Sequence, residues 1–165
     1  MAKRKGKGGL IESVLDRLID TEPRSQNELS PGMAQSLRQI KASLRRDLEW
    51  LLNTRQTIVE TPDYARELPY SVFAYGLPDL TSFSLNSARD QQDLLQIMET
   101  TIARFEPRLM NVVVTMLPVN EATRVVRFQI EGLLRADPAP ERVIFDTVFD
   151  TIRGEYQVGK ENSAG

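Results

Sequence analysis

Two residue types that serve in many active sites are missing from this 165-residue chain, which contains no cysteine and no histidine. Without cysteine, the chain cannot form a disulfide framework or a thiolate metal site. Without histidine, it lacks Ser-His-Asp and Cys-His catalytic sets, imidazole metal sites and the usual general base near neutral pH. These absences exclude the most common enzyme designs, favour a role without a cofactor, and fit a reducing compartment.

Long apolar runs are also missing from the sequence. No stretch approaches the roughly 18 apolar residues that a membrane-spanning helix needs. The basic start is not followed by the apolar segment and cleavage site of a secretory signal. We therefore expect a soluble protein that is neither exported nor inserted directly into a membrane.

Positive charge is concentrated at the start of the chain, in Lys3, Arg4, Lys5 and Lys7. The remaining body is therefore more acidic than the net charge of -2 for the whole chain suggests. An acidic body argues against a nucleic-acid-binding surface, which requires a basic patch. We interpret residues 1–9 as a flexible basic tail; the alternative is a weak contact of this tail with a membrane surface or an acidic partner.

The length of the chain and its 41% hydrophobic content predict one domain with a substantial core. A chain of this size buries about 70% of the surface that it exposes when unfolded. We place this domain at residues 10–156, between the basic tail and a loose C-terminal tail at residues 157–165.

Apolar residues at helical spacing predict two N-terminal helices. The first covers Leu10 to Ile19 and is followed by a polar linker at residues 20–29. The second begins between Ser30 and Ser36. Its apolar stripe consists of Leu37, Ile40, Leu44, Leu48, Leu51 and Leu52.

A long irregular connection and a third helix follow. Residues 53–85 are interrupted by prolines, but their tyrosines and leucines favour packing against the core over disorder. The third helix begins at Ser87-x-x-Asp90, a variant of the capping box. It ends at Glu106-Pro107-Arg108, because Pro107 lacks an N–H and biases Glu106 away from helical geometry.

The C-terminal half has the two-residue period of strands. Residues 109–119, 124–134 and 142–152 predict three strands joined by short loops, which favours an antiparallel meander. The fold class is therefore α+β, with the N-terminal helices and the central helix packed on a small three-stranded antiparallel sheet.

Two segments together resemble a known family. They are Ser43-Leu44-Arg45-Arg46-Asp47-Leu48-Glu49-Trp50-Leu51-Leu52-Asn53-Thr54-Arg55 and the Glu106-Pro107-Arg108 corner with its apolar strand. With the Tyr-Gly-Leu-Pro-Asp turn at residues 75–79, their order over roughly residues 10–155 resembles TssE, the baseplate subunit of bacterial type VI secretion systems. That family is related to the wedge protein of contractile phage tail baseplates.

The resemblance implies a structural role rather than catalysis. A protein of this family binds the baseplate subunits TssF, TssG and TssK and helps the sheath subunits TssB and TssC to start polymerising. It acts in the cytoplasm of a Gram-negative bacterium, in a baseplate docked to the inner-membrane complex. No nucleic acid, small-molecule substrate or cofactor is implied. Sheath subunits of such machines interlock through added strands, and the predicted sheet offers an edge for this mode of association.

The resemblance also points to partner-binding residues, which are Glu106, Pro107, Arg108, Arg45, Arg46 and Asp47. A guanidinium at a rigid corner can form a bidentate pair with a partner carboxylate. The alternative for the corner is an internal salt bridge, and the alternative for the helix residues is a solvated face or an internal ion pair. We expect Trp50 in the core rather than at an interface.

Two other functions are alternatives to the baseplate role. One is a lysozyme-like hydrolase that cleaves peptidoglycan, which requires two carboxyl groups about 5 to 9.5 Å apart, one of them a proton donor. Arg108 beside Glu106 favours the charged carboxylate, which is the wrong form for such a donor. The other is a protein-interaction module unrelated to secretion.

Overall fold

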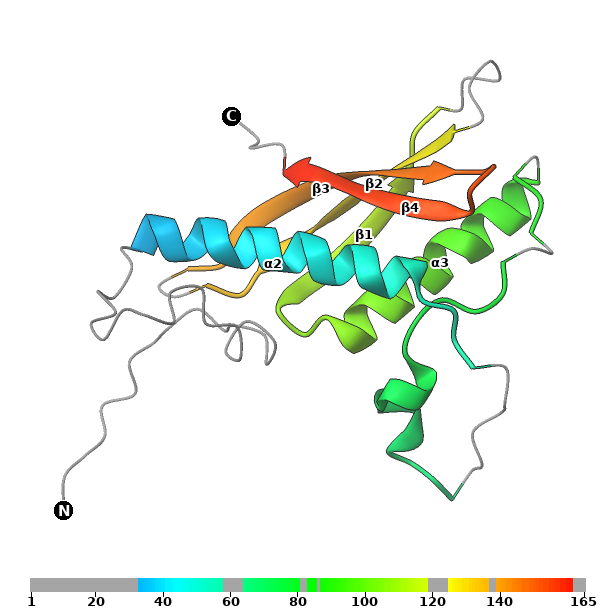
Figure 1. Ribbon diagram of the computed structural model, residues 1–165, viewed down its shortest axis with the longest axis horizontal. Helices are drawn as coiled ribbons and strands as arrows, with labels where there is room; N and C mark the ends of the chain where they lie inside the picture. Colours follow the sequence, from blue (N-terminus) through cyan, green and yellow to red (C-terminus); the bar gives the residue numbers. More distant parts are fainter. Residues whose placement is uncertain are drawn as a thin grey trace.

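The computed structural model of the chain contains two helices and four strands in the part that it describes (Figure 1). The described residues are 33–57, 64–80, 83–85, 87–118, 125–136 and 139–161. The elements are α2 (Met33–Asn53), α3 (Ala88–Phe105), β1 (Leu109–Met116), β2 (Val125–Leu134), β3 (Glu141–Asp150) and β4 (Glu155–Glu161), with the short 3-10 turns η1 (Leu68–Tyr70) and η2 (Val72–Ala74).

Of the three predicted helices, the second and the third are present as α2 and α3. The expected helix at Leu10 to Ile19, the linker at 20–29 and the basic tail at 1–9 lie outside the described residues. The start of α2 at Met33 falls within the predicted interval. The start of α3 is also confirmed, because the Ser87 side chain accepts a hydrogen bond from the Asp90 amide at 3.3 Å. This N-cap satisfies one of the amides that a helix leaves unpaired at its first turn.

The described strands form one antiparallel sheet in the order β1-β2-β3-β4. The prediction of a three-stranded sheet is therefore wrong, although the α+β class is right. The missed strand, β4, follows β3 after a tight turn in which Gly154 adopts a φ of 67°. It includes residues 157–161, which we expected to be loose, so the expected domain boundary at residue 156 lies inside a strand.

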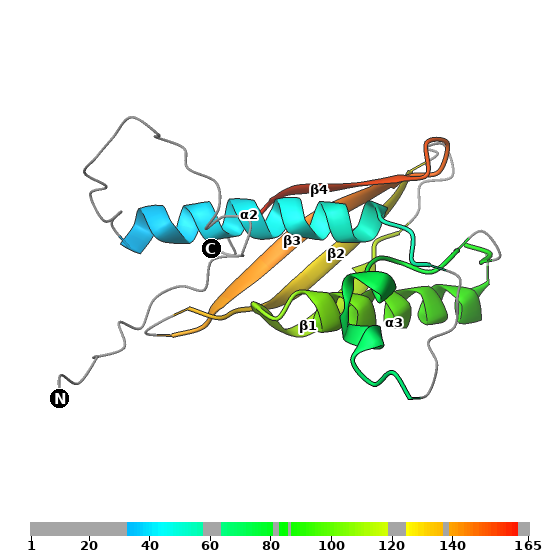
Figure 2. The ribbon, with the colours of Figure 1, turned by 60° about the horizontal axis from the view of Figure 1, so that its bottom comes forward.

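The sheet and both helices share one hydrophobic core. Along β2, Val126, Phe128 and Ile130 are buried in alternation with more exposed residues, as a two-residue period requires. These side chains pack with the apolar stripe of α2, including the fully buried Leu44 and Leu48. Burying a large apolar side chain contributes about 1.5 to 3 kcal/mol. Figures 1 and 2 show α2 running along β4 and α3 running beside β1.

Part of the long connection after α2 is packed, as expected. The Leu77 amide donates to the Thr54 carbonyl oxygen at 2.8 Å, and the Gln56 amide donates to the Leu77 carbonyl oxygen at 2.8 Å. Gly76 allows this close approach, because its φ is 110° and a Cβ there would lie 2.3 Å from the Thr54 oxygen. Tyr75 then packs edge-on against Phe105 of α3, with ring centroids 5.4 Å apart.

The Thr147 hydroxyl on β3 is fully buried. Among the residues that the structure describes, no group forms a hydrogen bond with it. Because an unpaired buried hydroxyl loses its bonds to water without replacement, it destabilises the folded state.

We predict that Thr147→Val, which removes this hydroxyl at nearly constant shape, raises the free energy of unfolding by about 1 kcal/mol. Urea denaturation would measure the change. Thr115→Val is the matched control, because Thr115 is exposed on β1 and its hydroxyl keeps its contact with water. A destabilised Thr147→Val variant would show that the hydroxyl has a partner.

Candidate functional site at the proline corner

The chain turns from α3 into β1 at the predicted corner. The Glu106 amide donates to the Ile102 carbonyl oxygen at 2.8 Å and so makes the last bond of α3. Pro107 follows on the surface, and the Leu109 amide donates back to the Glu106 carbonyl oxygen at 3.1 Å. The helix-to-strand turn that Pro107 predicts is therefore confirmed.

The two charged side chains of the corner face inward and bind each other. Glu106 is 4% exposed and Arg108 is 5% exposed. Arg108 Nε donates to Glu106 Oε1 at 2.7 Å, and Arg108 Nη2 donates to the other carboxyl oxygen. The Arg108 carbonyl oxygen also accepts from the Arg135 amide at 2.8 Å, just after β2. Glu106 and Arg108 thus form an internal salt bridge, which was one of the two interpretations of the corner in the sequence.

Helix α2 supplies the remaining partners of the guanidinium. Arg108 Nη2 donates to Asp47 Oδ2 at 2.6 Å, and Arg108 Nη1 donates to the Ser43 hydroxyl oxygen at 3.3 Å. Ser43 and Asp47 are four residues apart, so they lie on the same side of the helix. We call Ser43, Asp47, Glu106 and Arg108 the corner cluster. It joins two segments that are 61 residues apart in the sequence.

The electrostatics of the corner cluster follow from its burial. Burial alone would lower the pKa of Arg108, but the hydrogen bonds and charges of Glu106 and Asp47 outweigh it and raise this pKa above its ordinary value. Nearby, burial raises the pKa of the Tyr75 hydroxyl, and the charges of Asp47 and Glu106 raise it further. The cluster therefore holds a permanent cation between two carboxylates.

The ion pairs continue from the corner cluster to the surface. Asp47 Oδ1 accepts from Arg46 Nε at 3.0 Å and from Arg46 Nη2 at 2.8 Å. The Arg46 guanidinium in turn lies 5.2 Å from the ring centroid of Trp50, a cation–π distance. Trp50 is 52% exposed, so the expectation that it belongs to the core is wrong. It lies off the apolar stripe of α2, which explains its exposure.

A second set of α2 side chains binds the outer edge of β4. Asn53 Nδ2 donates to the Tyr156 carbonyl oxygen at 2.8 Å, and Asn53 Oδ1 accepts from the Tyr156 amide at 2.7 Å. Glu49 Oε2 accepts from the Val158 amide at 3.1 Å, and Arg45 Nη1 donates to the Val158 carbonyl oxygen at 3.5 Å. We call Arg45, Glu49 and Asn53 the edge-capping residues.

Sequence reasoning proposed Arg45 for a partner and missed the roles of Glu49 and Asn53. One feature of the sequence could have indicated these roles. Arg45, Glu49 and Asn53 are spaced four residues apart, which places them on one side of a helix. The spacing is visible in the sequence, but its meaning depends on β4, which the sequence analysis did not recognise as a strand.

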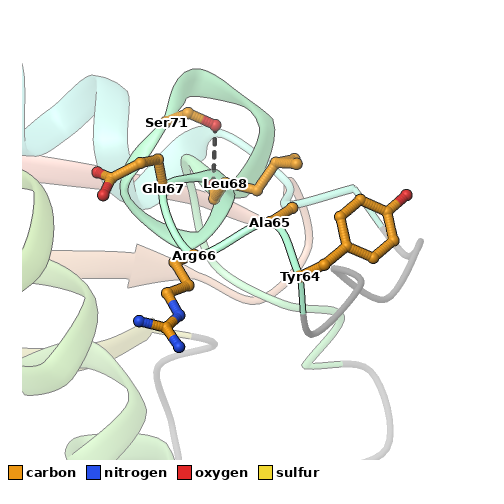
Figure 3. Close-up of a pocket in the computed structure, with 6 residues that line it drawn as sticks. All are labelled: Tyr64, Ala65, Arg66, Glu67, Leu68 and Ser71. Carbon is orange, nitrogen blue, oxygen red and sulfur yellow. Dashed lines mark hydrogen bonds between the residues drawn. The ribbon is translucent and has the colours of Figure 1, made fainter.

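The described residues contain little else that resembles a site. None of the helices in these ranges combines the length and apolar character needed to cross a membrane. Within the same ranges, no three acidic side chains gather as metal ligands would. Figure 3 shows an open depression beside η1 in which the charged side chains of Arg66 and Glu67 point to different sides. It is lined by Tyr64, Ala65, Arg66, Glu67, Leu68 and Ser71.

We predict that Arg108→Ala lowers the free energy of unfolding by about 3 to 5 kcal/mol, because it leaves the buried Glu106 carboxylate without its cation and removes one of the two cations that bind the partly buried Asp47. Urea denaturation would measure the loss. Arg142→Ala is the matched control, since Arg142 forms a similar two-pronged pair with Glu131 on the exposed face of the sheet. Removing this exposed pair should change stability little. Equal losses for both variants would contradict the central role of the corner cluster.

Tyr156 provides a prediction at alkaline pH. Burial raises the pKa of this phenol from 10.0 to about 12. The folded state therefore favours the neutral phenol, so its contribution to stability is complete below pH 10 and is lost as the pH rises toward about 12. Between about pH 9 and about pH 11.5, we expect this group to remove about 2 kcal/mol of stability.

Urea denaturation at the two pH values, compared between the unaltered protein and Tyr156→Phe, would isolate this effect. Phenylalanine retains the packing against Phe149, whose ring centroid lies 4.5 Å from that of Tyr156, but cannot ionise. The variant should lose less stability over this pH interval. The same loss in both proteins would contradict the assignment.

Comparison with known proteins identifies the family. The model of the family described as Baseplate wedge protein gp25 matches residues 38–139, which is more than half of the chain. The matched region contains the corner cluster and the edge-capping residues, whereas β4 lies beyond it. No curated protein and no solved structure gives a match. The resemblance to TssE is confirmed at the level of the family, and the chain belongs to the baseplate wedge protein family of TssE and phage gp25.

Proposed function

We propose that this protein is a structural component of the baseplate of a bacterial type VI secretion system. It binds the baseplate subunits TssF, TssG and TssK and helps to initiate polymerisation of the contractile sheath from TssB and TssC. It works in the cytoplasm, in a baseplate docked to the inner-membrane complex of a Gram-negative bacterium. The observation that carries this proposal is the match to the baseplate wedge family over residues 38–139.

The geometry of the corner is consistent with assembly rather than hydrolysis. A glycoside hydrolase needs one carboxyl group that can donate a proton to the leaving oxygen. Glu106 instead uses both carboxyl oxygens to accept hydrogen bonds from Arg108 and is buried. Asp47 binds the same guanidinium. We therefore propose that the protein has no enzymatic activity.

The corner supports partner binding in two ways in this proposal. The buried pair of Glu106 and Arg108 fixes the turn between α3 and β1, and Asp47 connects that turn to α2. The exposed Pro107 and Trp50 at the ends of this arrangement, together with the partly buried Arg46 side chain over Trp50, then contact the partner. Tryptophan and arginine are the residue types that contribute most to protein interfaces.

Affinity capture of the tagged protein from the bacterium that encodes it, followed by mass spectrometry, tests this function. Recovery of baseplate and sheath subunits is the expected result. If gentle lysis yields none of them, the secretion role is contradicted and an interaction module of another kind replaces it.

Two variants in the same capture experiment test the surface. Arg46→Ala should reduce recovery of at least one subunit while leaving the contact between Asp47 and Arg108 in place. Arg142→Ala, which removes an exposed arginine from the open sheet face, should leave recovery unchanged. Circular dichroism verifies that both variants fold. Full recovery with Arg46→Ala would contradict a contact at this end of α2.

A further inference from the structure

Both described helices lie on the same side of the sheet. α2 and α3 pack against the face that carries Phe128 and Phe145 (Figures 1 and 2). The opposite face, which we call the open face, carries the residues that alternate with them, including Arg127 and Gln129 on β2. An antiparallel sheet can expose such a face to water when its side chains are polar. Apolar side chains on the open face therefore indicate a covering layer.

The open face carries an apolar patch along β1. A bulge between Met110 and Val113, with Asn111 at a φ of 52°, turns both flanking side chains to this face. Leu117 continues the alternation, because its amide binds the carbonyl oxygen of Arg127, an open-face residue. We call four partly or largely exposed side chains, all outside the core of the described residues, the β1 patch: Met110, Val113, Leu117 and Leu133. Val113 is 52% exposed.

An apolar stripe near the start of the sequence matches this patch. The segment from Leu10 to Ile19 lies outside the described residues, but its sequence places six apolar residues at helical spacing. A helix over this segment would be about 15 Å long. The β1 patch extends from residue 110 to residue 117, which is about 25 Å along a strand. The patch is therefore long enough to cover the whole stripe, which an amphipathic helix buries against another layer.

The connection to α2 brings this segment to the correct end of the sheet. Lys41 on α2 binds Glu141 Oε1 at 2.5 Å, and Glu141 pairs with Leu134, the neighbour of Leu133. The start of α2 therefore lies at the end of the sheet where the β1 patch begins (Figure 1). Residues 20–32 span up to about 43 Å when extended. The path around this end to the open face crosses two layers, or roughly 20 Å.

We propose that residues 10–19 form a helix that covers the β1 patch, on the face of the sheet opposite α2 and α3. Leu18 lies at the Leu133 end of the patch, because the connection to α2 is there. This tether holds the segment near the patch at an effective concentration on the order of 1 mM, which favours it over a second copy or another protein. The β3 part of the open face, with Arg142, stays uncovered.

Engineered cysteine pairs in the full-length chain provide the first test. Because the chain contains no cysteine, the two introduced thiols can pair only with each other. Under mild oxidation, Leu18→Cys with Leu133→Cys should form an intramolecular disulfide at least about tenfold faster than Leu18→Cys with Val72→Cys. Val72 is the matched control, because it is 89% exposed on η2, beside α3. A segment without a fixed position would react with it at least as readily.

Electrophoresis without reductant separates the outcomes. A disulfide within the monomer, faster for the Leu133 pair than for the Val72 pair, is the expected result. Equal rates for the two pairs would overturn the proposal. Disulfide-linked dimers that disappear on dilution would assign the patch to a second copy of this chain, which also overturns it.

The coupling between two alanine substitutions provides the second test. Leu18→Ala should lower the urea midpoint of the unaltered protein, and should lower it by less than half as much when Leu133→Ala is already present, because contacting residues are not additive. In the Val72→Ala background, Leu18→Ala should keep its full effect. Circular dichroism verifies that each variant folds. If Leu18→Ala leaves the midpoint unchanged, as expected for a segment that binds only a partner subunit, the proposal is wrong.

The inference does not rest on the proposed function, since both tests use the isolated protein. If capture from the bacterium yields no baseplate or sheath subunit but the Leu133 pair forms its disulfide, the covered face stands and the secretion role fails. If capture succeeds and the two cysteine pairs react equally, the secretion role stands and the covered face is wrong.

Discussion

The structure depends most on the buried guanidinium of Arg108. A buried cation is stable only when carboxylates and hydrogen-bond acceptors surround it, because it has lost its water. Glu106 provides one carboxylate from the same corner, and Asp47 provides the other from α2. These contacts fix the position of α2 relative to the corner. Since the corner begins β1, the position of the first strand is fixed together with that of the helix.

Helix α2 connects three parts of the fold because its faces differ. Its apolar stripe enters the core through Leu44 and Leu48. Ser43 and Asp47 flank that stripe on one side and bind the corner, whereas the edge-capping residues flank it on the other side and bind β4. The polar residues that resemble the family pattern are thus largely occupied inside the molecule. Trp50, by contrast, stays 52% exposed on the same helix.

Most local structure could be predicted from the sequence, and most contacts between distant segments could not. The amphipathic period, the Ser87 cap and Pro107 indicate α2, α3 and the turn into β1, because each acts within a few residues. The inward orientation of Glu106 and Arg108 was one of two open interpretations, since a charged pair beside a proline suits a surface as well as a core. Trp50 was misplaced because a large aromatic residue usually belongs to the core.

Strand β4, which we did not predict, also depends on contacts between distant segments. Glu155 to Val158 alternates polar and apolar residues, but the run is short and ends at Gly159, so its pattern does not distinguish a strand from a coil. The ladder with β3 on one side and the side chains of Glu49 and Asn53 on the other stabilise it as β4. Amino-acid order thus defined the helices, the corner and the α+β class of this protein through short-range sterics and periodicity. The burial of the ion pair, the fourth strand and the binding of its outer edge by α2 were decided by tertiary packing, because each requires partners that are distant in the sequence.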